Sequence, residues 1–267
     1  MPRFRDQVNR EVEIAHSPQR IISTVPSQTE LLYHLGLESR TVGITAYCVR
    51  PPHWLKEKTV IGGTKNLQLE KIRSLKPDLI IGNKEENIRE QIEDLALEIP
   101  VWLSDICSVD DALAMIEAVG EITDTEAKAH DLRQNIAKAR TVAQEMPEIR
   151  TLYFIWSEPF MVAGHDTFIG QMLNEAGLKN VAPRNEQRYP QLKPEELEKL
   201  DPDLILLSSE PYAFKTADLH NLARRLPKAK FKLVDGELFS WYGSRMLLAF
   251  QYFQRLREEL KLLFANH

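Results

Sequence analysis

The chain has 267 residues, of which 43% are hydrophobic and 27% are charged, a composition typical of a globular protein with one large or two medium domains. Its formal net charge of −5 argues against a nucleic-acid partner, because such proteins carry a basic patch. No run approaches the ~18 apolar residues of a membrane span. Two cysteines, Cys48 and Cys107, are too few for a disulfide framework, and two separately buried thiols are expected.

The first part of the chain alternates apolar strands with helices. Ser27 and Glu30 have the spacing of a capping box, which predicts that a helix starts here and runs to Gly36. Strands separated by helices of about ten residues predict βαβ units and a mostly parallel sheet. The predicted strands are 20–25, 41–45, 59–63, 78–81 and 100–105, and the other predicted helices are 69–75 and 87–98.

The middle of the chain, 108–122 and 124–146, contains no strand signal and is rich in good helix formers. The second of these segments would be on the order of 35 Å long as a helix. Alternation of strands and helices then resumes at Arg150 and ends in a helix from Ser244. The predicted plan is an α/β lobe (1–122), a long connecting helix (123–147) and a second α/β lobe (148–267).

One phrase occurs twice. "LEKIRSLKPDLII" (69–81) reappears as "PEELEKLDPDLIL" (194–206), with Glu70 matching Glu195 and Asp78 matching Asp203. Each copy reads as a short helix, a proline turn and an apolar strand. A phrase that occurs twice indicates a duplicated unit, since a solenoid needs at least three repeats.

Five phrases in order carry a family resemblance: "RIISTVPSQTELLYHLG", "VIGGTKNLQLEKIRSLKPDLII", "FMVAGHDTFIGQMLNEAGLKNVA", "EELEKLDPDLILL" and "LFSWYGSR". Over residues 19–262 the chain resembles the substrate-binding proteins of ABC importers for cobalamin and iron-siderophores. The resemblance implies two Rossmann-like α/β lobes with mostly parallel sheets, joined by one long backbone helix, with the ligand in a cleft between the lobes. It implies a monomer without catalysis or an intrinsic cofactor that delivers a metal chelate to an ABC permease dimer.

The resemblance also implies a location in the periplasm or cell envelope. The first twenty residues are charged and lack an apolar core, so no secretory signal is expected within this chain. A cytoplasmic location is the alternative.

In the family, one Glu from each lobe docks onto arginine clusters of the two permease subunits, and the matching positions are Glu70 and Glu195. Carboxylates in equivalent positions of two lobes suit a two-fold symmetric partner and bidentate contacts with arginine. The alternative is that each Glu complements the dipole at a helix start.

Ligand-binding side chains are expected in loops after strand carboxyl ends, as is general for open α/β sheets. Aromatic rings and arginines there suit a polycyclic solute with anionic or amide groups. The alternative for Trp54 and Trp156 is a place in the core. The candidate ligand residues are Ser27, Tyr47, Arg50, Trp54, Trp156, Arg188, Tyr189, Trp241, Tyr242 and Arg245.

Three of these positions bear on which ligand is bound. Tyr189 matches the aromatic residue that precedes the "PQ" phrase in cobalamin binders, and Arg245 matches an arginine near the start of their last helix. Thr64 stands where cobalamin binders carry a Trp, and "SWYGSR" looks equally like the siderophore-binding members. The expected ligand is therefore cobalamin or an iron-siderophore.

Two other functions stay open at this point. Cys48 and His53 lie five positions apart and are weak candidates for direct binding of zinc or iron, although no C-x-x-C or H-E-x-x-H motif is present. An enzyme is disfavoured because the chain has no Walker glycine loop, nucleophile elbow or G-x-G-x-x-G motif. A cytoplasmic relative that senses, stores or modifies a chelate is the remaining alternative.

Overall fold

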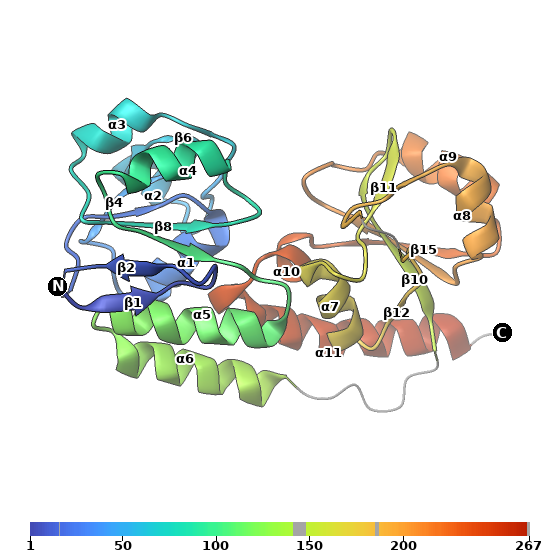
Figure 1. Cartoon of the computed structure of the whole chain (residues 1–267). Coiled ribbons are helices and arrows are strands. Elements are labelled where there is room, and N and C mark those ends of the chain that lie inside the picture. The colour runs from blue at the N-terminus through green and yellow to red at the C-terminus, as the bar shows by residue number, and fades with distance from the viewer. Residues whose placement is uncertain (16, 141–147, 185–186, 266–267) are drawn as a thin grey trace. The chain divides into compact units, whose positions relative to one another are not determined.

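The computed structural model describes residues 1–15, 17–140, 148–184 and 187–265. The described chain forms two compact α/β units. The first unit comprises Met1–Ile106, Asp110–Ala137 and, from far along the chain, Trp241–Arg245, and the remaining described residues form the second. Each unit is described by itself below, with the element labels of Figure 1.

The first unit is built on a five-stranded parallel sheet in the order β5-β4-β3-β8-β9. In the central pairing Ile22 lies beside Ile80. Two small antiparallel hairpins, β1-β2 and β6-β7, accompany the sheet. The bounds of these strands are β1 Arg3–Arg5, β2 Glu11–Glu13, β3 Ile21–Ser23, β4 Thr41–Ile44, β5 Thr59–Val60, β6 Gly62–Gly63, β7 Asn66–Leu67, β8 Leu79–Asn83 and β9 Val101–Ser104.

Helices cover both faces of this sheet, and accordingly every residue of β3, β8 and β9 is buried. Ile22, Ile80 and Leu103 form a core cluster with Ile72 of α3 and Ile92 of α4. The other face meets α1 and α5, where the Gln28 side chain approaches Met115. The helices are α1 Pro26–His34, α2 Trp54–Glu57, α3 Leu69–Ser74, α4 Arg89–Ala96, α5 Val109–Ile122 and α6 Glu126–Ala139.

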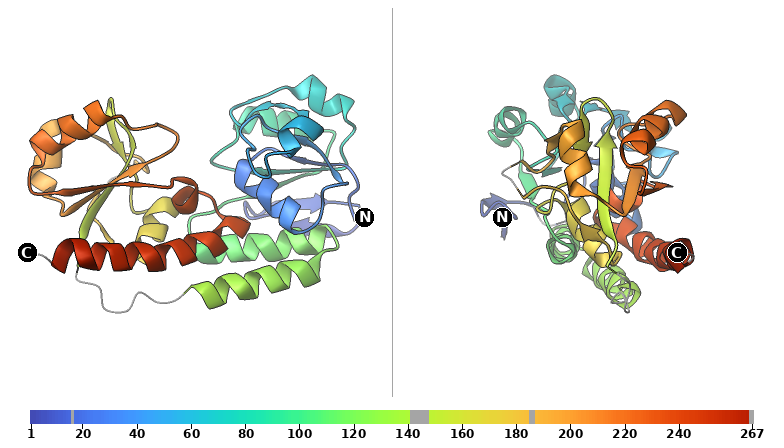
Figure 2. Two further views of the ribbon diagram at one scale, coloured as in Figure 1. Left: turned by 180° about the vertical axis from the view of Figure 1, so that it is seen from behind. Right: turned by 90° about the vertical axis from the view of Figure 1, so that its right-hand side faces the viewer.

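Helix α6 turns back beside α5, as both views of Figure 2 show. The turn places Arg133 Nε 2.9 Å from Glu117 Oε1. Of the predicted connecting helix, 123–147, the structure shows α6 over Glu126–Ala139, and residues 141–147 lie outside the described residues. The role of this segment as the connection between the lobes stays a prediction.

The second unit has a mixed sheet in the order β13-β11-β10-β14-β15, with β12 also paired to β10. The pairings β10-β14, β14-β15 and β10-β12 are parallel, and the two pairings of β11 are antiparallel. The bounds are β10 Arg150–Trp156, β11 Phe160–Val162, β12 Lys179–Asn180, β13 Gln191–Leu192, β14 Leu204–Ser208 and β15 Lys230–Val234.

The alternation of side chains along β10 divides the core of the second unit. Phe154 points into a cluster with Leu197 of α8 and Leu222 of α9. Tyr153 points the opposite way, and its ring lies 5.1 Å from that of Phe239 of α10. The helices are α7 Phe168–Glu175, α8 Pro194–Leu200, α9 Thr216–Arg225, α10 Glu237–Ser240 and α11 Met246–Ala265. The 3-10 turn η1, Gly243–Arg245, belongs to the first unit.

These sheets confirm the predicted fold class of two α/β units with mostly parallel strands. The capping box was wrong, because Val25 is the N-cap of α1 and no side chain caps that helix. The single strand predicted at 59–63 is divided in two at Ile61. Gly62 there has φ +103°, and a Cβ would collide with the Asn66 carbonyl oxygen, so this turn requires glycine.

The repeated phrase forms the same structure twice. In the first unit the Asp78 carboxylate accepts the backbone N–H groups of Gln19 and Arg20 at 2.7 and 2.8 Å. The Arg20 guanidinium in turn donates to the carbonyl oxygens of Leu75 and Lys76. Asp78 and Arg20 thus connect the start of β3 to the turn between α3 and β8 by hydrogen bonds.

The second unit repeats most of this arrangement at the matching residues. Asp203 accepts the backbone N–H of Arg150 at 2.8 Å, and the Arg150 guanidinium donates to the carbonyls of Leu200 and Asp201. The matching turn residues, Lys76 and Asp201, both have positive φ, 48° and 40°. The duplication therefore preserves the contacts that close the turn as well as its helix and strand.

Among the described residues, no helical segment combines the length and the apolar character that a membrane span needs.

Replacement of Asp78 by Ala should destabilise the first unit by about 1–3 kcal/mol, because two backbone N–H groups lose their acceptor. Urea unfolding followed by circular dichroism measures this, with Asp131→Ala as the control since Asp131 is exposed on α6. Asp203→Ala should have a comparable effect on the second unit. An Asp78→Ala protein that unfolds like the control would contradict the proposed contribution of Asp78 to stability.

Candidate functional site

Polar side chains fill the carboxyl ends of β3, β8 and β9 in the first unit. The Gln28 amide donates to the Gly82 carbonyl at 3.0 Å and to Ser104 Oγ at 2.6 Å. Asn83 Nδ2 donates to the same hydroxyl at 2.9 Å. Since these groups are buried, their mutual hydrogen bonds fix the strand ends in one arrangement.

A second group of hydrogen bonds extends this network to the loop after β8. Thr24 Oγ1 donates to Asn87 Oδ1 at 2.8 Å, and Asn87 Nδ2 donates to the Thr64 carbonyl at 3.1 Å. Thr64 is the position where cobalamin binders carry a Trp, and here only its backbone takes part in the described network. The loops after β3, β6 and β8 are thereby connected by side-chain amides.

The last segment of the first unit is held by a buried ion pair. Arg245 donates from Nε to Glu30 Oε2 at 2.9 Å and from Nη2 to Glu30 Oε1 at 2.6 Å, and both side chains are 8% exposed. The guanidinium carbon also lies 5.5 Å from the ring centroid of Trp241. Arg245 was predicted to face a ligand, and the structure shows its guanidinium directed at a protein carboxylate.

The neighbouring aromatic residues of this segment are buried too. Trp241 is 8% and Tyr242 is 5% exposed. The Tyr242 hydroxyl donates to Glu86 Oε1 at 2.7 Å. Burial, and after it the charge of Glu86, raises the pKa of Tyr242 well above its usual value, so the phenol stays a neutral donor.

Gly243 has a backbone conformation that residues with side chains rarely adopt. Its φ is +87°, and a Cβ there would lie 3.7 Å from the Ser27 carbonyl oxygen. The "WYGSR" phrase therefore needs glycine for a left-handed turn that lies on α1.

Three buried polar oxygens in this region have unused hydrogen-bonding capacity. Ser27 Oγ, Gln28 Oε1 and Ser244 Oγ have no hydrogen-bond partner within the described chain. Buried oxygens of this kind are usually satisfied by ordered water or by a ligand group. Ser27 is the only one of the three among the predicted ligand residues.

The loop after β4 places its two candidate aromatic residues differently. Tyr47 is 64% exposed, and a Cβ on Gly63 would lie 3.2 Å from Tyr47 Cε2, so the ring rests against that glycine. Trp54 is completely buried, and its indole N–H donates to Glu38 Oε1 at 3.0 Å. The structure favours the core interpretation for Trp54. Arg50 is exposed in the same loop.

Trp156 ends β10 and is 39% exposed, so the structure does not place it in the core. Its ring lies 5.1 Å from that of Tyr212, which comes from the loop after β14. The strands β10 and β14 are parallel neighbours, so both rings lie at one carboxyl edge of the sheet. The sequence-based prediction missed Tyr212.

Asp218, in the first turn of α9, supports this aromatic pair. It accepts hydrogen bonds from Ser157 Oγ at 2.6 Å and from the Tyr212 hydroxyl at 3.1 Å. Burial raises the pKa of Asp218, but these bonds and one from the Lys215 backbone N–H outweigh burial, and the net shift of its pKa is downward. Asp218 therefore stays ionised and holds Tyr212 beside Trp156.

The remaining candidates of the second unit, Arg188 and Tyr189, are half-buried. The Arg188 carbonyl accepts the Gly164 backbone N–H at 2.8 Å, which places this loop beside the end of β11. Their contact with a ligand stays a prediction.

The two candidate docking carboxylates occupy equivalent places. Glu70 is the second residue of α3 and Glu195 is the second residue of α8, and both are exposed. Glu70 contacts Arg73 at 2.7 Å, but Arg73 also pairs with Asp94 at 2.7 Å and Glu98 at 3.3 Å. One guanidinium therefore serves three carboxylates.

Cys48 and His53 do not come together as one metal site. The Cys48 thiol is buried and lies 3.0 Å from Thr29 Oγ1 and 3.2 Å from Thr45 Oγ1. Burial raises the pKa of this thiol, which disfavours the thiolate that a metal would require. His53 Nε2 instead lies 3.1 Å from Glu38 Oε1.

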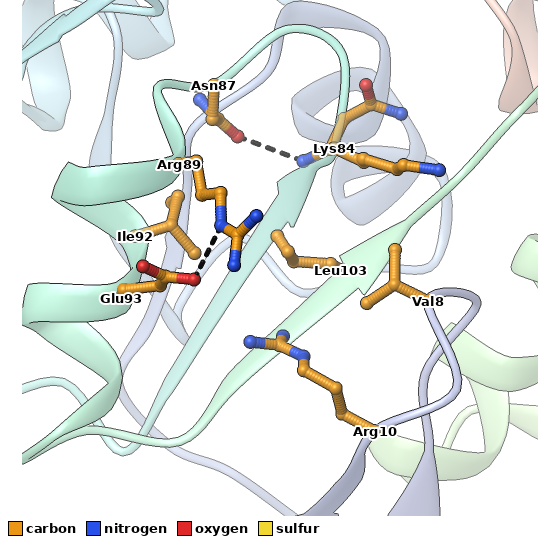
Figure 3. Close-up of a pocket in the computed structure, with 9 residues that line it drawn as sticks. Val8, Arg10, Lys84, Asn87, Arg89, Ile92, Glu93 and Leu103 are labelled. Carbon is orange, nitrogen blue, oxygen red and sulfur yellow. Dashed lines mark hydrogen bonds and ion pairs between the residues drawn. The ribbon is translucent and has the colours of Figure 1, made fainter.

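A cavity of about 370 Å³ lies between α4 and the β1-β2 hairpin of the first unit (Figure 3). Its apolar wall includes Val8, Ile92 and Leu103. Figure 3 shows Arg10 and Arg89 reaching into it from opposite sides, and each also pairs with an acid, Asp6 and Glu93 respectively. The cavity reaches the polar network through Asn83 and Asn87.

Residues 21–229 match the family model described as periplasmic binding protein. The chain is 30% identical to an uncharacterized ABC transporter substrate-binding lipoprotein, YvrC, of Bacillus subtilis, over 91% of this chain and 81% of that protein. It is 27% identical to a vitamin B12-binding protein of Pectobacterium carotovorum, over 88% of this chain and 86% of the relative.

Among solved structures, the periplasmic vitamin B12 binding protein BtuF of Vibrio cholerae superposes with a TM-score of 0.79 at 23% identity. The match covers 92% of this chain and 99% of that one, which shows a shared fold.

Replacement of Arg245 by Met should lower the free energy of unfolding of the first unit by about 3–5 kcal/mol, because the Glu30 carboxylate stays buried without its partner. Urea unfolding measures the effect. The double variant Glu30→Gln/Arg245→Met should recover part of the loss, since the uncompensated charge is gone. If the single variant is within about 0.5 kcal/mol of the parent protein, the pair does not hold this segment.

Proposed function

Because the chain belongs to the periplasmic binding protein family, we propose that it captures a bulky metal chelate, cobalamin or an iron-siderophore, for delivery to an ABC importer. The chelate is the transported solute and not a resident cofactor. The vitamin B12-binding relative at 27% identity supports a corrinoid as the first candidate.

The observation that carries this proposal is a solvent-exposed aromatic ring at the strand carboxyl ends of each unit. Tyr47 follows β4 in the first unit, and Trp156 ends β10 in the second. Both rings are exposed although large apolar side chains are normally removed from water. Flat rings beside directed polar groups suit a large, rigid, partly apolar ligand.

Each ring packs against at least one neighbour. Tyr47 lies against Gly63, and Trp156 donates its indole N–H to the Glu158 carbonyl at 2.9 Å and packs on Tyr212. A ring that already packs against a neighbour loses less conformational freedom when a ligand stacks on it. We include Tyr212 with Trp156 as a ligand-contacting residue, while Ser27, Arg50, Arg188, Tyr189, Trp241, Tyr242 and Arg245 keep the role that the family resemblance gives them.

Binding of cobalamin, cobinamide, haem, and ferric catecholate or hydroxamate siderophores should be measured by thermal shift and then by isothermal titration. A ligand that binds the native state raises the melting temperature by mass action. Replacement of Trp156 or Tyr47 by Ala should weaken the best ligand about tenfold or more, as expected when an aromatic contact worth about 1.4 kcal/mol or more is lost.

Tyr33→Ala is the matched control, because Tyr33 is also an exposed aromatic residue but lies on α1 away from the strand ends. Catalytic turnover of any ligand in the panel would contradict the proposal, as would full affinity in both Trp156→Ala and Tyr47→Ala.

Glu70 and Glu195 are proposed to dock the loaded protein onto arginines of the permease. Neighbouring groups support this role. Glu196 accepts the Lys193 backbone N–H at 2.7 Å and so fulfils the local capping function that Glu195 would otherwise serve. Glu70 is 90% exposed and shares its arginine with two other carboxylates. Both carboxylates can thus be used by a partner without loss of the fold.

The double variant Glu70→Ala/Glu195→Ala should bind its permease at least tenfold more weakly, because charge-assisted contacts to arginine are worth about 1.5–3 kcal/mol each. Its affinity for the solute should be unchanged. Pull-down onto the permease in nanodiscs measures docking, and Glu90→Ala/Glu126→Ala, which removes two exposed carboxylates from the first turns of α4 and α6, is the matched control. Equal docking by both double variants would refute the assignment.

A further inference from the structure

Three potential metal ligands meet beside the amino-terminal ends of β4 and β5. Glu38 lies in the turn between α1 and β4, His53 immediately precedes α2, and Glu57 ends α2. One ligand atom from each residue lies within 4.8 Å of the other two. His53 Nε2 and Glu38 Oε1 are 3.1 Å apart. This separation is close to that of two ligands bound to one ion at about 2.0–2.1 Å in tetrahedral geometry.

Helical spacing brings two of the three side chains onto one face. His53 and Glu57 are four positions apart, at the N-cap and the last residue of α2. Positions i and i+4 are neighbours on a helix surface, which is the spacing used by paired ligands of helical metal sites. The third ligand, Glu38, comes from a different element and closes the group.

Neighbouring side chains hold Glu38 and His53 in place. The fully buried Trp54 donates its indole N–H to Glu38 Oε1 at 3.0 Å, and Lys58 Nζ donates to the Glu38 carbonyl at 2.6 Å. The edge of the Tyr33 ring meets the His53 ring at a centroid distance of 5.8 Å. Hydrogen bonds to a ligating carboxylate and a fixed imidazole orientation are the usual outer supports of a metal site.

The group retains coordination capacity. Within the described chain, Glu38 Oε2 and the Glu57 carboxylate make no hydrogen bond or ion pair. Two carboxylates can therefore compensate the charge of a divalent ion while the imidazole supplies a nitrogen.

We propose that Glu38, His53 and Glu57 bind a Zn²⁺ ion, with solvent completing the coordination. One imidazole nitrogen with two carboxylates is a ligand set for zinc and similar first-row ions, whereas Ca²⁺ and Mg²⁺ prefer oxygen ligands alone. The site lies at the amino-terminal end of β4, and Tyr47 follows the carboxyl end of the same strand. The zinc site is therefore separate from the ligand residues of the proposed function and does not depend on them.

Tag-free, EDTA-treated full-length protein should bind one equivalent of Zn²⁺ in an isothermal titration, and saturating Zn²⁺ should raise its melting temperature. His53→Ala and Glu57→Gln should each weaken zinc binding at least about tenfold, a loss of about 1.4 kcal/mol or more. Glu57 is exposed, so Glu57→Gln should melt like the parent protein without metal. Mg²⁺ and Ca²⁺ should give no shift.

Two control variants test whether zinc binds at a different place on the chain. His220→Ala removes an exposed histidine on α9, and Cys48→Ser removes the buried thiol of the loop that carries His53. Both should bind zinc like the parent protein. Absence of zinc binding by the parent protein at millimolar concentration, unchanged affinity in His53→Ala and Glu57→Gln, or loss of binding in Cys48→Ser would each overturn the proposal.

Discussion

The arrangement of the polar loops in the first unit depends on the buried pair of Glu30 and Arg245. Removing two charges from water is strongly unfavourable, and only bidentate contact with further hydrogen bonding compensates for it. Here the pair joins a residue of the first helix to one near the last helix, so it fixes where Trp241–Arg245 returns to the first unit. The hydrogen bond from Tyr242 to Glu86 and the left-handed turn at Gly243 follow from that return.

The duplicated phrase shows how one local arrangement can serve two units. Asp78 and Asp203 bind backbone N–H groups at the start of a strand. Arg20 and Arg150 bind carbonyls of the turn that comes just before Asp78 and Asp203 respectively. The arginine contacts satisfy carbonyls that the end of each helix leaves unpaired. Because the interior of each copy is satisfied locally, the outward-facing glutamate beside it is not needed for the turn. That separation is consistent with the docking role proposed for Glu70 and Glu195.

Periodicity predicted most of the regular elements, because buried parallel strands and amphipathic helices leave strong patterns along the chain. It did not predict what is decided by distant contacts. Glu30 follows Ser27 at the spacing of a capping box, and no local signal shows that its partner is Arg245. Trp54 follows a proline-rich stretch and Trp156 ends an apolar run, and neither context shows that Trp54 is fully buried and Trp156 exposed. Tyr212 carries no motif, and only the pairing of β10 with β14 brings it to Trp156.

The environment of each carboxylate decides what it can do in this acidic protein. Glu30 is buried and makes a bidentate contact with the Arg245 guanidinium, so its role is structural. Glu70 is exposed and competes with Asp94 and Glu98 for one arginine, so an external cation can satisfy it more fully than Arg73 does. Glu38 lies between these cases: Trp54 fixes one oxygen, and the carboxylate lies beside His53 and Glu57. A fixed, ionised and incompletely satisfied carboxylate beside an imidazole has the properties that a divalent ion requires, and neither of the other two environments provides them.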